Sequence, residues 1–234
     1  MQKLSIIVPA YNEAKTIRRV VEQIFEVAFP VEFEIIIVDD SSSDRTYRLA
    51  KILDKSDLKG RIRLYRNDRN RGKGYCIRRG LENAAGDVVI VQDADFEYDP
   101  HEIPKLLKPI AEGKTSVVYG SRFLGRPHPP GMAFANWIAN RFLTWMTNVL
   151  FGSKLTDMET CYKLMKKEIA QKIQLRSERF DFEPEVTARI LKNGFPILEL
   201  PISYHGRTHH EGKKIKARDF FIALWVLFRE RLRP

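Results

Sequence analysis

The chain has 234 residues, of which 44% are hydrophobic, so it can bury one sizeable core and is not a disordered protein. Its 40 Lys and Arg against 30 Asp and Glu give a net charge of +10, which predicts an anionic partner: a nucleic acid, a membrane surface or a phosphorylated substrate. Cys76 and Cys161 have neither zinc-ligand nor disulfide-framework spacing, which fits a reducing compartment.

Short apolar runs alternate with amphipathic helical patterns along the chain. The runs typical of buried strands are residues 4–8, 34–38, 61–65, 88–91, 117–120 and 197–200. Helical patterns lie at 17–28, with Asn12 as candidate N-cap, at 47–53, up to about 85, from near 100, at 134–150, after 184 and at 221–232. This order implies right-handed crossovers and a mostly parallel sheet covered by helices on both faces. No secretory signal and no membrane-spanning segment are expected.

Polar side chains follow three of the predicted strands at the point where each strand ends. They are Tyr11, Asn12, Glu13, Asp39, Asp40, Asp93 and Asp95. In a parallel sheet, ligands bind beyond the carboxyl ends of the strands, so these side chains are expected to line one crevice. Asp39 or Glu13 can accept hydrogen bonds from ribose hydroxyl or base imide groups. The alternative for Asp39 and Asp40 is helix capping at a solvated loop.

The sequence QDADFEYDP after the strand at 88–91 is the strongest candidate for a metal site. Asp93 and Asp95 can turn both carboxylates toward one hard cation, whose open positions would take phosphate oxygens. Taken alone, a D-x-D pattern more often belongs to a turn or a helix cap. The turn at 72–74 lacks the spacing of a Walker phosphate loop.

Five stretches of the chain resemble the successive motifs of the family 2 glycosyltransferases, which have the GT-A fold. They are SIIVPAYNE, EIIIVDDSSSDRT, RNRGKGYCIRRGL, VVIVQDADFEYDP and VVYGSRF. Within that family the chain is most similar to dolichol-phosphate mannose synthases and related polyprenyl-phosphate glycosyltransferases. The likeness is strong from Leu4 to Phe123 and looser to Lys214. It implies a Rossmann-like α/β GT-A domain with amphipathic helices in its C-terminal half. Residues 1–125 would bind the donor and 126–234 the acceptor, within one structural domain.

The resemblance also implies roles for individual residues on the donor side. The residues expected to contact the nucleotide sugar are Pro9, Tyr11, Glu13, Asp39, Asp40, Lys73, Asp93 and Ala94. Asp93 and Asp95 would bind Mg²⁺ or Mn²⁺ together with the donor diphosphate, and Asp95 would be catalytic. Glu97 matches the position of a third metal ligand, and its carboxylate suits that role chemically.

On the acceptor side, Arg122 matches the arginine of a GSR motif and would be a catalytic contact to the acceptor phosphate, because a forked guanidinium suits phosphate. The alternative is an ordinary salt bridge to a nearby Asp. Asn140, Arg207 and Lys213 are the other expected phosphate contacts. Asp157 would be the general base if the acceptor were a hydroxyl. A lipid phosphate is already anionic and needs no base.

Two apolar stripes and a basic segment leave alternatives open. The tryptophan-rich stripe at 134–150 and the stripe at 221–232 are expected to pack in the core or to lie in a membrane interface. From Ser203 onward the sequence has eight Lys and Arg against three acidic residues, which would attract anionic lipid. Glu183 is expected near the crevice or as a partner of a helix dipole. His209 and His210 are expected in a loop without metal.

The sequence therefore predicts a metal-dependent inverting glycosyltransferase. It would move mannose or glucose from a GDP- or UDP-sugar to a polyprenyl or dolichyl phosphate. We expect it to be cytoplasmic and peripheral on the inner face of an anionic membrane, with a separate membrane-anchoring partner as an open alternative. The other hypotheses are a family 2 transferase acting on a sugar hydroxyl with Asp157 as base, and a non-catalytic sugar-nucleotide-binding protein. No nucleic-acid partner is expected, since acids crowd the predicted crevice.

Overall fold

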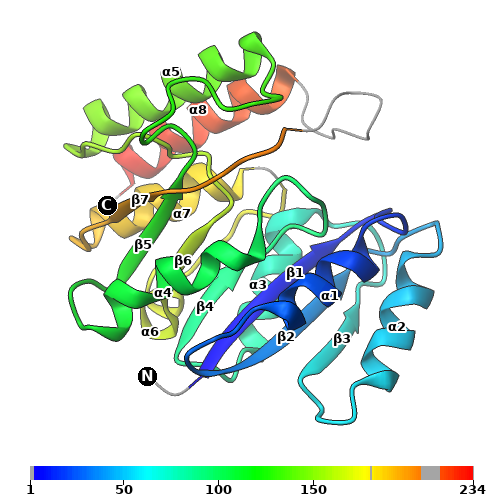
Figure 1. The fold of residues 1–234 in the computed structure, drawn as a ribbon. Helices are drawn as coiled ribbons and strands as arrows, with labels where there is room; N and C mark the ends of the chain where they lie inside the picture. The colour runs from blue at the N-terminus through cyan, green and yellow to red at the C-terminus, as the bar shows by residue number, and fades with distance from the viewer. Residues whose placement is uncertain (1–2, 180, 207–216, 234) are drawn as a thin grey trace.

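The computed structural model describes residues 3–179, 181–206 and 217–233 (Figure 1). The described strands are β1 (Lys3–Ala10), β2 (Glu32–Asp39), β3 (Ile62–Arg66), β4 (Val88–Val91), β5 (Val117–Ser121), β6 (Lys163–Lys166) and β7 (Leu198–Pro201). The described helices are α1 (Ile17–Glu26), α2 (Thr46–Ser56), α3 (Lys73–Asn83), the 3-10 turn η1 (Pro100–Glu102), α4 (Ile103–Ala111), α5 (Phe134–Phe151), α6 (Lys167–Lys172), α7 (Phe182–Lys192) and α8 (Ala217–Leu232).

One seven-stranded sheet runs through the molecule in the order β3-β2-β1-β4-β6-β5-β7. β6 is antiparallel to both of its neighbours, and the remaining neighbouring pairs are parallel. The prediction of a mostly parallel α/β sheet is therefore confirmed. β6 was not predicted from the sequence, and it lies between the strand that ends in the D-x-D pattern and β5.

Helices cover both faces of the sheet, with α1 and α4 in front of it and α3 and α6 behind it in Figure 1. The central strands β1, β2 and β4 are therefore buried on both sides, and their apolar runs at 4–8, 35–38 and 88–91 form the middle of the core. This arrangement explains why these strands read as continuous apolar runs instead of alternating patterns. The boundary predicted between residues 125 and 126 falls between β5 and α5, within one continuous sheet. The division into a donor half and an acceptor half stays a prediction.

The helices α5, α7 and α8 form a separate layer above one end of the sheet (Figure 1). Small and apolar side chains fill the space between them, namely Leu143, Met158, Ala188, Ala223 and Leu227. Buried charges also join two of the helices. Arg189 of α7 pairs with Glu185 of the same helix at 2.8 Å and with Glu230 of α8 at 3.1 Å. In the parts of the chain that the structure describes, no helix is long and apolar enough to cross a membrane.

The predicted N-cap of the first helix is wrong. α1 begins at Ile17, and Asn12 lies five residues earlier in a left-handed conformation with a φ of 53°. The Asn12 side-chain oxygen accepts a hydrogen bond from the Ser43 backbone nitrogen at 2.9 Å. Asn12 therefore joins the loops that follow β1 and β2, and this partner lies 31 residues away in the sequence.

A close contact fixes the position of α3 on the sheet. Gly80 lies in the middle of α3, and a Cβ atom placed on it would be only 2.4 Å from the Ile7 side chain of β1. The glycine of the RRGL sequence is therefore required by packing, despite its low helix propensity.

We expect the substitution Gly80→Ala to destabilise the protein by about 1–3 kcal/mol, because the added methyl group overpacks the contact with β1. Urea unfolding followed by circular dichroism measures this change. Glu82→Ala on the exposed side of the same helix is the matched control and should change the free energy of unfolding by less than about 0.5 kcal/mol. Equal effects of the two substitutions would contradict the packing argument.

Candidate active site

The candidate site lies at the carboxyl ends of the parallel strands. Parallel pairing brings Ala10, Asp39 and Arg66 into register at the ends of β1, β2 and β3. Asp39 is fully buried, and its Oδ2 atom lies 3.3 Å from Arg66 Nε and accepts from the Ser42 nitrogen at 3.2 Å. Its Oδ1 atom is buried without a hydrogen-bond partner among the described residues. This oxygen is an acceptor suited to a ligand donor such as a base imide or a ribose hydroxyl.

The loop after β1 is joined directly to the D-x-D loop after β4. The Thr16 hydroxyl lies 2.6 Å from the Ala94 carbonyl oxygen and 3.1 Å from Glu13 Oε2. The Glu13 backbone nitrogen donates to Thr46 Oγ1 at 2.8 Å, which ties the same loop to the start of α2. Glu13 and Ala94 are therefore brought together as predicted for one crevice, while their contacts with a nucleotide sugar stay a prediction, as do those of Pro9 and Tyr11.

Asp40 holds the basic loop that precedes α3. One of its carboxylate oxygens accepts from the Arg71 nitrogen at 2.9 Å and from the Asn67 side chain at 2.7 Å. The other oxygen accepts from the Gly72 nitrogen at 2.7 Å. Both oxygens are thus used to fix the loop that positions Lys73, and a direct contact between Asp40 and a nucleotide stays a prediction.

Lys73 carries its ammonium group from the start of α3 to the first D-x-D carboxylate. Lys73 Nζ lies 2.8 Å from Asp93 Oδ1, 3.5 Å from Glu183 Oε1 and 3.6 Å from Cys161 Sγ. Burial by itself lowers the pKa of Lys73, but the nearby Asp93 and Glu183 carboxylates hold it well above its usual range. Lys73 therefore stays charged and partly neutralises Asp93.

Asp95 and Glu97 occupy the turn that follows. Asp95 Oδ1 accepts from the Glu97 nitrogen at 3.0 Å, and Glu97 Oε2 accepts from the Tyr204 hydroxyl at 3.0 Å. No group of three His, Cys, Asp or Glu side chains that could hold a metal ion occurs in the described ranges. Mg²⁺ is commonly held by one or two carboxylates together with phosphate oxygens and water. Asp93 and Asp95 fit a cation of that kind, and Glu97 as a third ligand stays a prediction.

Arg122 and Asp157 form a buried bidentate ion pair. Arg122 Nε and one terminal nitrogen lie 2.7 and 2.8 Å from the two Asp157 oxygens, and the Arg122 backbone nitrogen also donates to Asp157 at 3.0 Å. The Arg122 guanidinium also lies 5.2 Å from the centre of the Tyr204 ring, and Tyr204 contacts Glu97. The predicted alternative of a salt bridge is thus present. Both Asp157 oxygens are engaged, so Asp157 is arranged to orient Arg122.

Glu159 was missed by the sequence reasoning. Its side chain is partly buried, and its Oε1 atom is fully buried without a hydrogen-bond partner among the described residues. Burial raises the pKa of Glu159 to about 7, against the lowering effect of Lys163. Nothing in the local sequence METCYK distinguishes Glu159 from a surface acid, because its surroundings come from distant parts of the chain.

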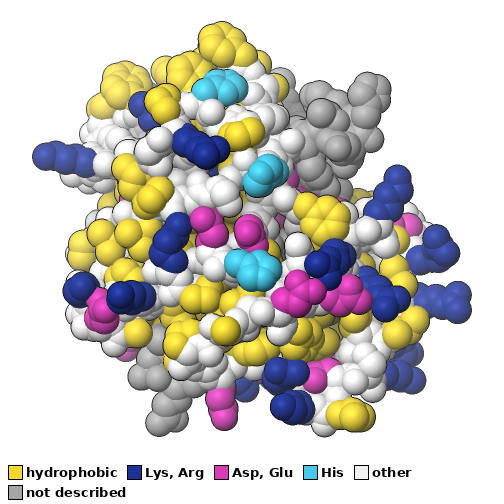
Figure 2. All heavy atoms as spheres, viewed as in Figure 1, with side chains coloured by type: hydrophobic (Ala, Val, Ile, Leu, Met, Phe, Trp, Pro, Cys, Tyr) yellow, Lys and Arg dark blue, Asp and Glu magenta, His cyan; other side chains and the backbone are white. Residues whose placement is uncertain are grey.

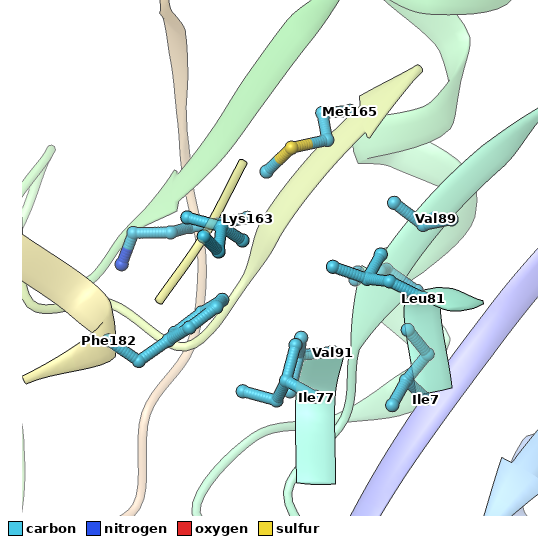
Figure 3. Close-up of a pocket in the computed structure, with 10 residues that line it drawn as sticks. Ile7, Ile77, Leu81, Val89, Val91, Lys163, Met165 and Phe182 are labelled. Carbon is cyan, nitrogen blue, oxygen red and sulfur yellow. The ribbon is translucent and has the colours of Figure 1, made fainter. Parts of the chain in front are cut away.

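Lys163 is the buried charge on the new strand β6. Its ammonium group donates to Glu183 of α7 and to the Thr160 carbonyl oxygen. Figure 3 shows its aliphatic stem near Phe182 and Met165, where it lines a cavity of about 10 Å³. A cavity of this size has room for at most about one water molecule, so it is not a substrate site.

For three of the predicted acceptor contacts, Asn140, Arg207 and Lys213, the described residues show no contact with Arg122. Asn140 lies on α5, where its side-chain nitrogen donates to the Asn136 carbonyl oxygen at 2.8 Å. Arg207 and Lys213 lie outside the described residues, as do His209 and His210. Their contacts with an acceptor phosphate stay predictions.

Known proteins with similar sequences are glycosyltransferases. A family model described as Glycosyl transferase family 2 matches residues 5–174. The chain is 28% identical over 235 residues to the dolichol-phosphate mannosyltransferase of Pyrococcus furiosus, with 97% of this chain covered. It is 27% identical over 228 residues to the dodecaprenyl-phosphate galacturonate synthase of Rhizobium johnstonii, with 96% covered. The chain spans 63% and 65% of the lengths of these two relatives.

Solved structures share the fold. Glucosyl-3-phosphoglycerate synthase from Mycobacterium tuberculosis, in complex with Mn²⁺, uridine diphosphate and phosphoglyceric acid, matches all of this chain and 80% of its own, with a TM-score of 0.74 and 17% identity. A mannosyltransferase from Pyrobaculum calidifontis, in complex with GDP-Man and Mn²⁺, matches 85% of this chain and 54% of its own, with a TM-score of 0.64 and 19% identity. The predicted GT-A type of α/β fold is confirmed.

The pKa of Glu159 makes stability depend on pH in a defined direction. The folded protein holds the Glu159 proton up to about pH 7, whereas the unfolded chain loses it near pH 4.5. The free energy of unfolding contributed by this proton is therefore fully present below pH 4.5 and is lost as the pH rises through 7. The charged groups around Glu159 that set this pKa are Lys163, Glu183, Arg122 and Asp157.

We expect the stability of the native protein, relative to the variant Glu159→Gln, to fall between about pH 4.5 and 7 and to be constant above this range. Urea unfolding of both proteins across this pH range measures the difference. Glu168→Gln, on the exposed side of α6, controls for the change from carboxylate to amide. A difference that does not vary with pH would contradict the burial of a protonated Glu159.

Proposed function

Because the chain belongs to glycosyl transferase family 2, we propose that it is an inverting glycosyltransferase that moves a hexose, mannose or glucose, from a GDP- or UDP-sugar to a polyprenyl phosphate. The observation that carries this proposal is that two charged pairs lie at the same site and are linked through Tyr204 and the D-x-D loop. Asp93 with Lys73 forms the first pair, and Arg122 with Asp157 forms the second. Tyr204 joins the second pair to the loop that carries Asp93, since its ring lies 5.2 Å from the Arg122 guanidinium and its hydroxyl donates to Glu97 of that loop.

The donor side fits a nucleoside diphosphate sugar. The unpartnered Asp39 oxygen would accept from the base or the ribose, and the Lys73 ammonium lies beside Asp93, where the diphosphate is expected. A divalent cation held by Asp93 and Asp95 would neutralise the charge that develops on the leaving diphosphate. Lys73 is a second positive charge at the same place, fixed by the Asp40-bound loop before any ligand arrives.

The acceptor side fits a phosphate better than a hydroxyl. Arg122 is held in one orientation by both Asp157 oxygens, which leaves its remaining N–H donors for a phosphate oxygen. That oxygen would form the new bond to the anomeric carbon as the bond to the donor diphosphate breaks. Asp157 is engaged with Arg122, so this arrangement favours an acceptor that needs no general base. Two relatives, named dolichol-phosphate mannosyltransferase and dodecaprenyl-phosphate galacturonate synthase, support the same acceptor class.

An exposed apolar surface, the α5–α8 face, supports peripheral contact with an anionic lipid membrane. It consists of Phe134, Ile138, Phe142, Trp145, Val149, Phe221, Ile222, Trp225, Phe228 and Leu232. These are ten of the fifteen large hydrophobic side chains that are exposed among the described residues, and Phe221 and Trp145 are 68% and 56% exposed. Hydrophobic side chains gather at the top of the molecule in Figure 2, where α5 lies in Figure 1. Such a concentration is typical of a surface that is covered in use.

The activity is tested with radiolabelled GDP-mannose, GDP-glucose and UDP-glucose, each mixed with polyprenyl phosphate and Mg²⁺ or Mn²⁺ and then extracted with organic solvent. We expect label in the lipid phase with one donor. The substitution Asp95→Asn should lower this transfer by at least about 100-fold, because it removes a carboxylate that neutralises the diphosphate. Asp54→Asn on α2 is the matched control and should transfer normally. Label confined to water-soluble product would refute the lipid acceptor, and an active Asp95→Asn protein would refute the metal assignment.

Membrane contact is tested by co-sedimentation with vesicles of phosphatidylcholine and phosphatidylserine. Trp145→Glu and Phe221→Glu should each lower the bound fraction by about tenfold or more, because each removes an apolar group from the membrane interface and adds a negative charge. Leu58→Glu is the matched control, since Leu58 is fully exposed in the turn after α2 and lies outside the α5–α8 face. A similar loss with Leu58→Glu would show that net charge alone decides binding.

A further inference from the structure

One carboxyl oxygen of Glu159 is buried and accepts no hydrogen bond from the described residues. Its Oε1 atom has no hydrogen-bond partner among the described residues, although buried carboxylate oxygens are almost always hydrogen-bonded. Leaving such an atom unpaired costs stability. Groups of this kind cluster at functional sites, where a bound ligand can supply the missing donor.

Glu159 lies near both charged pairs of the candidate site. Arg122, Asp157 and Glu183 all act on its carboxyl group, and Glu183 Oε1 lies 3.5 Å from Lys73 Nζ. Two residues before it, Asp157 is paired with Arg122 on the acceptor side. Two residues after it, Cys161 Sγ lies 3.6 Å from the Lys73 ammonium, which is paired with Asp93 on the donor side. The group that is transferred has to pass between these two pairs. With the donor diphosphate at Lys73 and the acceptor phosphate at Arg122, as proposed above, Glu159 would lie beside the transferred sugar.

The protein's own cations around Glu159 are already engaged. Arg122 is bound by both oxygens of Asp157, and the Lys163 ammonium donates to Glu183 and to the Thr160 carbonyl oxygen. A carboxylate here would repel the donor diphosphate and an acceptor phosphate, which are also anionic. A ligand group that fits Glu159 is therefore uncharged and donates a hydrogen bond. Sugar hydroxyl groups meet both conditions.

We propose that Glu159 determines donor specificity by hydrogen-bonding one hydroxyl group of the transferred sugar. This inference rests on the proposed function, since it assumes a nucleotide sugar in the crevice. The raised pKa of Glu159 agrees with it, because near neutral pH the carboxyl group both accepts from and donates to a hydroxyl. A site built around such a bond discriminates strongly against a sugar that lacks the hydroxyl group.

The inference is tested by isothermal titration calorimetry on the full chain with Mg²⁺. The ligands are GDP-mannose and UDP-glucose, with GDP and UDP as the matched ligands without sugar. Glu159→Ala should weaken binding of the nucleotide sugar by about 10- to 100-fold and leave binding of the free diphosphate unchanged. Glu159→Gln should recover part of the loss, because its amide also hydrogen-bonds a hydroxyl.

Deoxy analogues of the preferred donor identify the hydroxyl group. One of the 2-, 3-, 4- and 6-deoxy sugars should bind the native protein about 10- to 100-fold more weakly than the parent and should bind Glu159→Ala as well as the parent does. The same penalty for every analogue in both proteins would overturn the inference. So would equal weakening of diphosphate and nucleotide sugar by Glu159→Ala, which indicates a structural role.

Two further results separate this inference from the proposed function. Thermal unfolding of Glu159→Gln should occur at the same or a higher temperature than that of the native protein, because an unpaired buried carboxylate has been removed. A clear drop in that temperature would overturn the inference by showing that Glu159 supports the fold. A native protein that binds neither nucleotide sugar would overturn the proposed function and this inference together, whereas normal native binding with an unchanged Glu159→Ala protein would overturn this inference alone.

Discussion

The structure around the crevice depends on the need to pair every charge that it buries. Lys163 of β6 is almost completely buried and is paired with Glu183 of α7, which also lies 3.5 Å from Lys73 of α3. Lys73 in turn contacts Asp93 at the end of β4. One chain of alternating charges thus ties four elements together. Because breaking a buried pair costs several kcal/mol, these four elements cannot shift independently, and the first D-x-D carboxylate is held in place before any ligand binds.

Charge pairing also distinguishes the two ion pairs of the candidate site from Glu159. Asp157 holds the Arg122 guanidinium in one orientation, in which its remaining N–H groups are proposed to contact an anionic acceptor. Lys73 and Asp93 form the corresponding pair on the proposed donor side. Glu159 lies near both pairs with one oxygen left unpaired among the described residues. The charged pairs thus suit the phosphate groups of both proposed substrates, while the unsatisfied Glu159 oxygen suits the uncharged sugar that would pass between them.

The sheet was largely predictable from the sequence because its central strands are buried on both faces and read as apolar runs. β6 was not, since its sequence KLMK begins and ends with lysine, and the buried charge of Lys163 is paired with Glu183, 20 residues later. For the same reason the sequence indicated a salt bridge as one alternative for Arg122 without identifying Asp157 as its partner. The unpaired oxygen of Glu159 is a property of the assembled crevice. The absence of a hydrogen-bond donor for this oxygen among the described residues could not be predicted from the sequence.

The ion pairs between α7 and α8 have a mechanical consequence. Arg189 of α7 holds Glu230 of α8, and Glu185 on the first turn of α7 holds Arg189. Glu183, which completes the charge chain of the crevice, lies on that same first turn. The two helices are therefore linked by ion pairs that continue, through Glu183, to the buried charges of the crevice. A displacement of α8 would disturb α7 and, through Glu183, the position of Lys73.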